Sequence, residues 1–274
     1  MKQKIAREFN LSETVFLHDD TSKSGPETRE VDIFTIDREL PFAGHPTIGT
    51  AVFVRHHLPG GEGVRTLAIK AGAIGIEPLP ALPRGIRAQI PHNTHLHAKT
   101  LRDVLTPSAA GLHTHPAIRE AELDAPVFSC VRGMTFVLVP LPSLELLGEV
   151  RILPLGFDAL SESLLDEGWR DGFAARYYYV DVGREGGRRC LRTRMLEPGF
   201  EDPATGSAAT CLGLYLTLAQ EKKATTFQMT QGVEMGRKSI ISVETTVGDG
   251  GELAQVYLGG TAVVVMQGTL RVDV

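Results

Sequence analysis

Two stretches of the chain repeat one pattern. In the first, a strand-like segment leads through the loop ELPFAG to a helix that starts HPTIGTAV; in the second, a strand leads through EPGFEDPATG to a helix that starts SAATCLG. Each helix follows a glycine, Gly44 or Gly206, and has small residues in its first turn. Such a helix start presents unpaired backbone N–H groups and a positive dipole end, which favour an anion such as a carboxylate. The alternative interpretation is that small residues only let each helix pack closely on a sheet.

The two copies of the repeat are expected to lie on either side of a domain boundary. A length of 274 residues also favours two domains over one. The segment from residue 90 to about residue 125 is polar, rich in histidine and without a clear helix or strand pattern. Part of it is therefore interpreted as the domain connection. The predicted domains are residues 1–120 together with a final strand at 262–274, and residues 121–261.

Composition excludes several classes of function. The net charge of -5 does not indicate a surface for nucleic acid or for anionic membranes. No apolar run approaches the length of a transmembrane helix, and the start MKQKIAREFNLSE lacks the apolar stretch of a signal peptide. Three cysteines without paired spacing are typical of a reducing compartment, so the expected location is the cytoplasm.

Three motifs in order identify a family resemblance. NLSETVF lies at 10–16, AGHPTIGTA at 43–51 and EDPATGSAA at 201–209, and GGTAVVVMQGTLRV follows near the end. Together they resemble the phenazine-biosynthesis isomerase (PhzF) family over nearly the whole chain. The resemblance implies the diaminopimelate-epimerase-like fold, an α/β (α+β) architecture of two similar domains. In each, a mixed, barrel-like sheet surrounds a central helix, and the active site lies in the cleft between the domains.

The resemblance also implies an activity: a cofactor-independent isomerase, a homodimer without metal, that moves a proton on a small carboxylate-bearing substrate. Glu13 would be the general acid/base, because a carboxyl whose pKa is raised by an apolar cleft can take and return a proton near neutral pH. The other residues that the motifs assign are His45 and Asp202 as catalytic partners, and Gly44, Gly206 and Ser207 as substrate contacts. Without the resemblance, Glu13 is a solvated turn residue, His45 a loop histidine and Asp202 a helix cap.

One departure from the family concerns the first domain. Members usually begin with a strand and a helix before the segment that corresponds to NLSET. We therefore expect this chain to lack that strand and helix, which leaves its first sheet incomplete.

Two other enzyme classes are less well supported by the residues. Racemases and epimerases of the same fold use one thiol from each domain, but the corresponding loops here read GHP and TGSA. The three cysteines fall instead on expected strands (Cys130, Cys190) or inside a helix (Cys211). A metal enzyme is indicated only by the histidines, and these lack the spacing of a zinc motif, so they are interpreted as loop residues. They are His92, His95, His97, His113 and His115.

A phosphate or nucleic-acid site would use the arginines after the GREGG turn, Arg188, Arg189, Arg192 and Arg194. They alternate along an expected strand, which favours a solvated face, with Arg194 the one directed toward the cleft. A binding or regulatory protein that has kept the fold but lost turnover is the alternative outside the enzymes. The presence of Glu13, His45 and Asp202 together argues against it.

Overall fold

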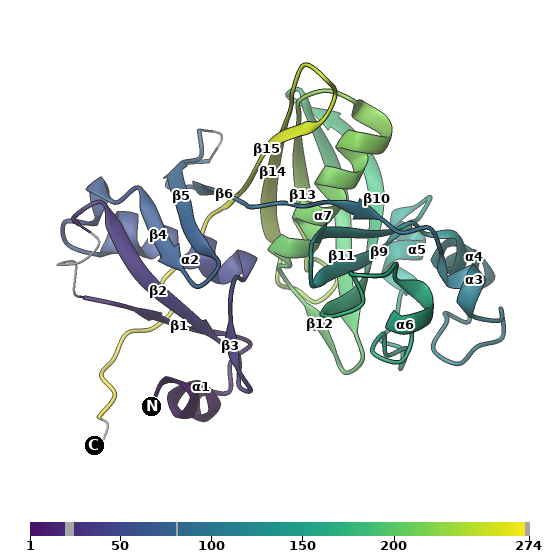
Figure 1. The fold of residues 1–274 in the computed structure, drawn as a ribbon, viewed down its shortest axis with the longest axis horizontal. Helices are drawn as coiled ribbons and strands as arrows, with labels where there is room; N and C mark the ends of the chain where they lie inside the picture. The colour runs from purple at the N-terminus through teal and green to yellow at the C-terminus, as the bar shows by residue number, and fades with distance from the viewer. Residues whose placement is uncertain (20–24, 81, 272–274) are drawn as a thin grey trace. The chain divides into compact units, whose positions relative to one another are not determined.

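A computed structural model describes residues 1–19, 25–80 and 82–271. The chain is a mixed α/β protein that divides into two compact units, residues 1–88 with 259–274 and residues 89–258 (Figure 1). The first division therefore falls at 88/89, whereas the sequence placed it at 120/121. The reason is that Leu101, Leu112, Ile118 and Leu123 are buried in the hydrophobic core of the second unit.

The first unit is a sheet with the strand order β1-β2-β4-β5-β6, in which β2 and β4 are parallel and the other pairs antiparallel. The short strand β3 also pairs with β2. Its elements are α1 (Lys2–Phe9), β1 (Thr14–Leu17), β2 (Thr28–Phe34), β3 (Glu39–Leu40), α2 (Gly44–His57), a 3-10 turn (Gly61–Gly63), β4 (Thr66–Ile69), β5 (Gly72–Pro78) and β6 (Ile86–Gln89).

Helix α2 is the predicted small-residue helix of this unit, and it packs against β1. Most of its residues are buried, so little of it presents a polar face to solvent. Arg55, His56 and His57 occupy its last turn, where positive charge is favourable at the negative end of the helix dipole. Its first turn carries no acidic residue and stays electropositive.

The second unit is a larger sheet with the order β7-β8-β9-β10-β11-β13-β14-β15, with β12 beside β11. Strands β9 and β10 are parallel, as are β11 and β13. Its elements are β7 (His95–Leu96), α3 (Leu101–Val104), α4 (Pro116–Asp124), β8 (Val127–Val131), β9 (Met134–Pro140), α5 (Leu144–Glu149), α6 (Ser161–Leu164), β10 (Phe173–Glu185), β11 (Arg188–Glu197), β12 (Phe200–Asp202), α7 (Gly206–Leu216), a π turn (Thr217–Glu221), β13 (Thr225–Gln231), β14 (Ser239–Val247) and β15 (Leu253–Gly260).

Helix α7 is the second predicted small-residue helix, and it contacts β8 and β9 as well as β14. Those strands are far apart in the sheet order, so the sheet curves around the helix. A Cβ atom on Gly213 would lie 2.7 Å from Cγ1 of Val243 on β14, closer than side-chain packing allows. Close packing is therefore one use of the small residues in α7. No helix within the described ranges has the length and apolar character needed to cross a membrane.

The end of the chain differs from the prediction. A strand is expected at 262–274, but residues 261–271 form neither helix nor strand and are exposed; residues 272–274 lie outside the described residues. Val263 is 83% and Met266 86% exposed. An alternating apolar segment becomes a strand only where another strand offers it hydrogen-bond partners. None of the sheet pairings described above includes this segment.

A buried ion pair joins α4 to the sheet of the second unit. One oxygen of Glu122, Oε1, accepts hydrogen bonds from Arg176 (3.0 Å) and from the hydroxyl of Tyr178, and Oε2 accepts one from the backbone N–H of His113 (2.7 Å). The side chains of Glu122 and Arg176 are 0% and 1% exposed. Removing one partner of such a pair leaves a buried charge uncompensated.

We expect Glu122→Gln to lower the free energy of unfolding of the second unit by about 3–5 kcal/mol, because the charge of Arg176 then lacks its counter-ion. The single tryptophan, Trp169, belongs to this unit, so its fluorescence during urea titration measures the change. The matched control is Asp124→Asn, two residues along the same helix, whose side chain is 64% exposed and pairs with Arg102. Equal effects of the two changes would contradict the assignment.

Candidate functional site

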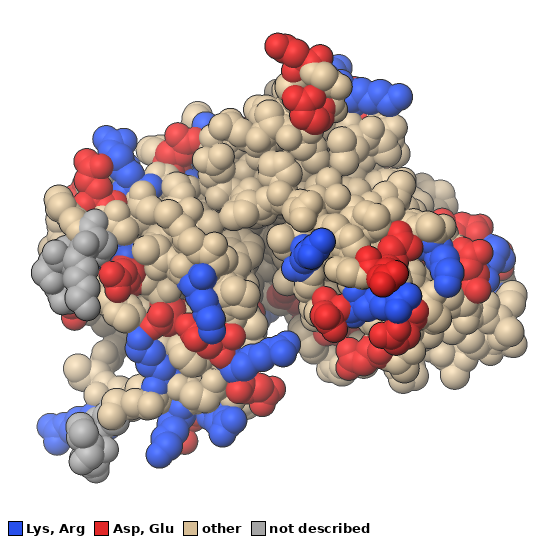
Figure 2. All heavy atoms as spheres, viewed as in Figure 1, with Lys and Arg blue, Asp and Glu red and all other residues tan. Residues whose placement is uncertain are grey.

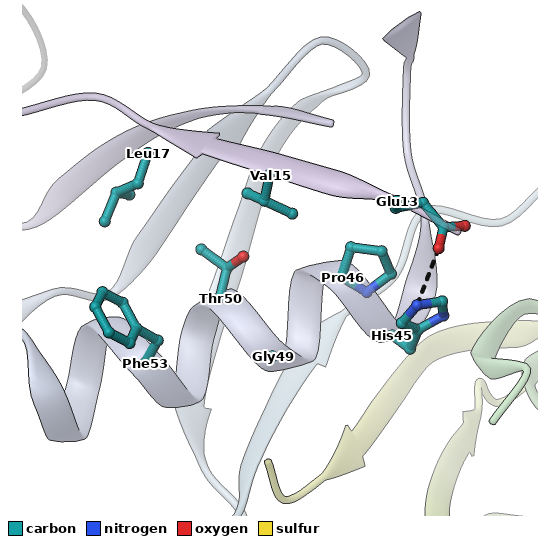
Figure 3. A pocket seen from close by; sticks show the side chains of 8 residues that line it. All are labelled: Glu13, Val15, Leu17, His45, Pro46, Gly49, Thr50 and Phe53. Atoms are coloured by element: carbon teal, nitrogen blue, oxygen red, sulfur yellow. Dashed lines mark ion pairs between the residues drawn. The ribbon is translucent and has the colours of Figure 1, made fainter. Parts of the chain in front are cut away.

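Glu13 and His45 form the centre of the candidate site in the first unit. Glu13 immediately precedes β1, after α1 has ended at Asn10 in the left-handed conformation (φ 49°). His45 lies in the first turn of α2. Its Nε2 is 3.0 Å from Oε2 of Glu13 (Figure 3). Two motif residues that are 32 positions apart in sequence, 13 and 45, are thus in direct contact.

The pair lies at one end of a pocket between β1 and α2, with a volume of about 400 Å³. From the pair the pocket extends past apolar side chains of the two elements (Figure 3). The remaining lining residues are Val15, Leu17, Pro46, Gly49, Thr50 and Phe53. The site therefore combines one acidic group and one imidazole with an apolar wall.

The carboxyl of Glu13 is largely enclosed, with its side chain 18% exposed. Its Oε2 is buried and receives no well-aligned hydrogen bond from the described residues, although His45 is at ion-pair distance. Burial raises the pKa of Glu13, but the interaction with His45 and a hydrogen bond involving Ser12 outweigh it, and the pKa lies below its ordinary value. The sequence-based expectation of a raised pKa is therefore wrong, because burial is not the only influence on this carboxyl.

Gly44 is buried at the first position of α2, after Ala43. The carbonyl oxygen of Ala43 accepts hydrogen bonds from the N–H (3.2 Å) and the hydroxyl (2.7 Å) of Thr47. These bonds hold the start of the helix in place beside the Glu13–His45 pair. The N–H groups of the first turn lack carbonyl partners within the helix by geometry.

Asp202, Gly206 and Ser207 come together in the second unit, at the start of α7. The carboxyl of Asp202 accepts hydrogen bonds from the N–H of Ala204 (3.1 Å, to Oδ1) and the hydroxyl of Thr205 (2.7 Å, to Oδ2). Asp202 thus shapes the loop that enters the helix. It does not cap α7, because the N-cap is Thr205 and neither bond comes from an N–H group of the helix. Gly206 is buried and Ser207 half-buried in the first turn.

Glu197 is a group that the sequence analysis missed. It ends β11, on the other side of the short β11–β12 turn from Asp202. Burial and the nearby charge of Asp202 raise the pKa of Glu197 to about 7. Nothing in the sequence marks this residue, since its shift depends on the hairpin that returns Asp202 to the end of β11.

Arg194 is not directed toward a substrate site, contrary to the prediction. Its guanidinium is buried, binds Glu201 through two nitrogens (both 2.8 Å) and donates to the carbonyl oxygens of Leu147 (2.7 Å) and Val150 (3.0 Å). A buried guanidinium needs such partners, and they tie α5 and β12 to β11.

On the face shown in Figure 2, basic and acidic side chains are intermixed and do not separate by sign.

His95 and His97 in the second unit have local structural partners. The ligand atoms of His95, His97 and Asp166 lie within 4.8 Å of one another. In His97, however, Nδ1 accepts the N–H of Asp166 (3.1 Å) and Nε2 contacts the hydroxyl of Ser129 (2.9 Å), so both ring nitrogens are engaged. Burial, together with the charge of His95, lowers the pKa of His97 to about 4. Spacing in the sequence does not reveal this cluster, because Asp166 is contributed by a distant segment.

The family of the chain follows from comparison with known proteins. A profile of the PhzC-PhzF family, described as phenazine biosynthesis-like protein, matches residues 1–268. The chain belongs to the PhzC-PhzF family. This confirms the resemblance that the three motifs carry.

Two curated relatives and one solved structure show the range of similarity within PhzC-PhzF. An uncharacterized isomerase of Mesorhizobium japonicum is 35% identical, with 98% of this chain and 87% of that protein covered. Trans-2,3-dihydro-3-hydroxyanthranilate isomerase of Pseudomonas chlororaphis is 29% identical, with 98% and 87% covered. The crystal structure of the PhzF-family phenazine biosynthesis protein of Bacillus anthracis matches with a TM-score of 0.69 at 19% identity, over 94% of this chain and 84% of that one. The chain is an isomerase of this family.

The cysteines of this PhzC-PhzF chain are placed for packing. Cys211, inside α7, is fully buried and lies 3.1 Å from the carbonyl oxygen of Phe128 through its Sγ. Burial raises the pKa of its thiol well above the ordinary value, which disfavours the thiolate that a two-thiol mechanism needs. Cys130 is also buried, and Cys190 is half-buried on β11.

We expect Cys211→Ala to lower thermal stability, because it removes a fully packed side chain, and to leave proton transfer within about tenfold of the unmodified protein. The measurement is deuterium incorporation from solvent into a panel of small carboxylic acids. Cys190→Ala is the control for a less buried thiol. A folded Cys211→Ala protein without exchange would support a thiol mechanism and contradict the expectation.

Proposed function

We propose that this chain is a cofactor-independent isomerase that moves a proton between carbon atoms of a small carboxylate-bearing substrate, with Glu13 as general acid and base. The observation that carries the proposal is the enclosed carboxyl of Glu13, paired with His45 at one end of an apolar-walled pocket. Because Oε2 is buried and faces His45, we assign the proton to the other carboxyl oxygen, Oε1. Family membership and the isomerase relatives support the reaction class.

The proposed reaction begins with Glu13 ionised, as its lowered pKa favours at neutral pH. The carboxylate takes a proton from one carbon of the substrate, and the C–H electron pair delocalises into the adjoining conjugated system. The protonated carboxyl, whose proton exchanges with solvent, then delivers a proton to a different carbon. The product is an isomer of the substrate, so no oxidant, reductant or co-substrate is consumed.

His45 has two tasks in this proposal. It keeps Glu13 ionised before the reaction, and it stabilises the neutral carboxylic acid less than the carboxylate, so that the proton is readily returned. Gly44 on α2, and Gly206 and Ser207 on α7, are proposed to bind the substrate through the N–H groups of the helix starts. Asp202, in the loop before α7, is proposed to contribute to substrate binding.

The proposal extends to the finer architecture and to a first substrate. We infer that each sheet forms a barrel-like wall around its helix, supported for α7 by its contacts with β8, β9 and β14. A homodimer in solution is part of the same proposal. The substrate named for the Pseudomonas chlororaphis relative, trans-2,3-dihydro-3-hydroxyanthranilate, is the first compound to test. It carries the carboxylate and the conjugated carbons that the mechanism requires.

We expect Glu13→Gln to reduce substrate-carbon exchange in deuterated water by at least about 10²- to 10⁴-fold, the usual contribution of one positioned acid–base group. The amide keeps the shape of the side chain but cannot take the proton, so ligand binding should largely persist. The control is Glu8→Gln, on the exposed surface of α1. Exchange at the rate of the unmodified protein in Glu13→Gln would transfer the acid–base role to another group.

The Glu13–His45 interaction also predicts a pH dependence. Because the pKa of Glu13 in the folded protein is below the ordinary 4.5, its ionised form is retained above that value and is lost only as the pH falls through the lower folded pKa. The pair therefore stabilises the folded state above pH 4.5, and this contribution disappears on acidification. In His45→Gln the electrostatic attraction of the imidazole is lost, so less opposes the effect of burial and the pKa of Glu13 should rise.

The pKa is measured by carbon-13 NMR titration of the Glu13 carboxyl in both proteins, which needs no turnover. The acid limb of kcat/KM should move upward in pH with it. An unchanged Glu13 titration in His45→Gln would contradict the assigned cause of the shift.

A further inference from the structure

The loop that carries Asp202 rests on the end of strand β13. Gln231, the last residue of that strand, is 0% exposed. Its side-chain Nε2 donates hydrogen bonds to the carbonyl oxygen of Asp202 (2.8 Å) and to Oγ1 of Thr205 (2.9 Å). One amide group therefore holds both ends of the four-residue loop 202–205.

The orientation of this amide follows from the chemistry of its partners. The backbone carbonyl of Asp202 only accepts hydrogen bonds, so the NH₂ side of the amide must face it. The Oε1 side then accepts a hydrogen bond from the hydroxyl of Tyr177 (2.9 Å), which is itself 0% exposed and lies 2.9 Å from Oγ1 of Thr193. The amide is satisfied on both sides by buried groups, which disfavours any other rotamer.

The contact with Thr205 also determines where the Thr205 proton points. Because Nε2 of Gln231 donates to Oγ1, the hydroxyl proton is directed to its other neighbour, Oδ2 of Asp202, at 2.7 Å. The N–H of Ala204 fixes the second carboxyl oxygen, Oδ1, at 3.1 Å. The chain of bonds from Gln231 through Thr205 thus sets the direction of the Asp202 carboxyl.

The next residue, Gly232, brings the backbone close to the same loop. Its φ of +75° is in the left-handed region, and a Cβ atom there would lie 2.9 Å from the carbonyl oxygen of Pro203 and 2.4 Å from that of Arg237. A side chain at this position would displace the loop from Gln231. The end of β13 is therefore shaped to seat the loop through both its side chain and its backbone.

We propose that Gln231 is a positioning residue, which holds the Asp202 carboxyl and the first turn of α7 in the arrangement that the isomerase reaction uses. The inference rests on the proposed function for the role of Asp202 and α7. Gln231 acts through Asp202 and Thr205 and does not itself handle the proton. The essential feature is a hydrogen-bond donor at the end of this side chain.

Two variants test whether the hydrogen-bond donor of the Gln231 side chain is required. Gln231→Met keeps the approximate length of the side chain and removes both donor and acceptor. Gln231→Glu keeps the hydrogen-bond acceptor toward Tyr177, but its carboxylate cannot donate a hydrogen bond. Burial raises the pKa of such a carboxyl, and once protonated it can donate again. The matched control is Gln228→Met, a half-buried glutamine three residues earlier on the same strand.

We expect Gln231→Met to lower kcat/KM by about 10- to 100-fold, as for a reacting group displaced by about 1 Å. Gln231→Glu should be equally impaired at neutral pH and should recover relative to Gln231→Met as the pH falls. A role in stability alone does not predict this pH-dependent recovery. Gln228→Met should retain the activity of the unmodified protein.

Amide hydrogen exchange of the peptide that contains residues 202–208 tests the same contact without any turnover. Faster exchange in Gln231→Met, but not in Gln228→Met, is expected. Unchanged exchange, or faster exchange without loss of activity, would overturn the positioning role. If the unmodified protein has no isomerase activity, the proposed function fails, and the exchange comparison still decides whether Gln231 holds the loop.

Discussion

Helix α7 has almost no polar surface, and much of the second unit follows from the need to cover it. Residues on every side of the helix are buried, including Ala208, Cys211, Leu212 and Leu216. A helix that is apolar all round is stable in water only when other elements surround it, and here β8, β9 and β14 do so. Its middle therefore has no access to a ligand. Any contact of α7 with a ligand is limited to its first turn, where the loop 202–205 enters and backbone N–H groups are unpaired by geometry.

The Glu13–His45 pair shows how one contact reverses the effect of burial. An isolated carboxyl in an apolar pocket holds its proton more tightly and stays protonated to a higher pH. Beside His45 the same carboxyl is kept ionised, which prepares it to accept a proton. In the second unit, burial and the charge of Asp202 shift the pKa of Glu197 in the opposite direction, and no residue in the described part of the chain offsets them as His45 does for Glu13. The pKa values of these two carboxyls thus shift in opposite directions because their neighbouring groups differ.

The sequence predicted those features that depend on neighbours along the chain. The two small-residue helices and the strand after the GREGG turn belong to this class. The pairing of Glu13 with His45, which are 32 positions apart, was expected only from the family resemblance. The roles of Gln231 and Tyr177 did not emerge, because they depend on strand pairing that brings distant segments together. The pairing of Arg194 with Glu201 depends on the β11–β12 hairpin, which the sequence analysis did not predict. The prediction of a final strand was wrong for a related reason. The apolar pattern of residues 262–266 indicates a strand, but a pattern does not supply a pairing partner.

Strand β10 contains three consecutive tyrosines, which by themselves do little to distinguish one pairing register from the next. A shift by one residue would exchange tyrosine for tyrosine at two positions while turning every side chain to the opposite face. Arg176 removes this ambiguity. It shares a face with Tyr178, and both reach Glu122, whereas Tyr177 reaches Gln231 on the other face. A slipped strand would carry the guanidinium away from its carboxylate and into an apolar layer, so the buried charge selects the correct register during folding.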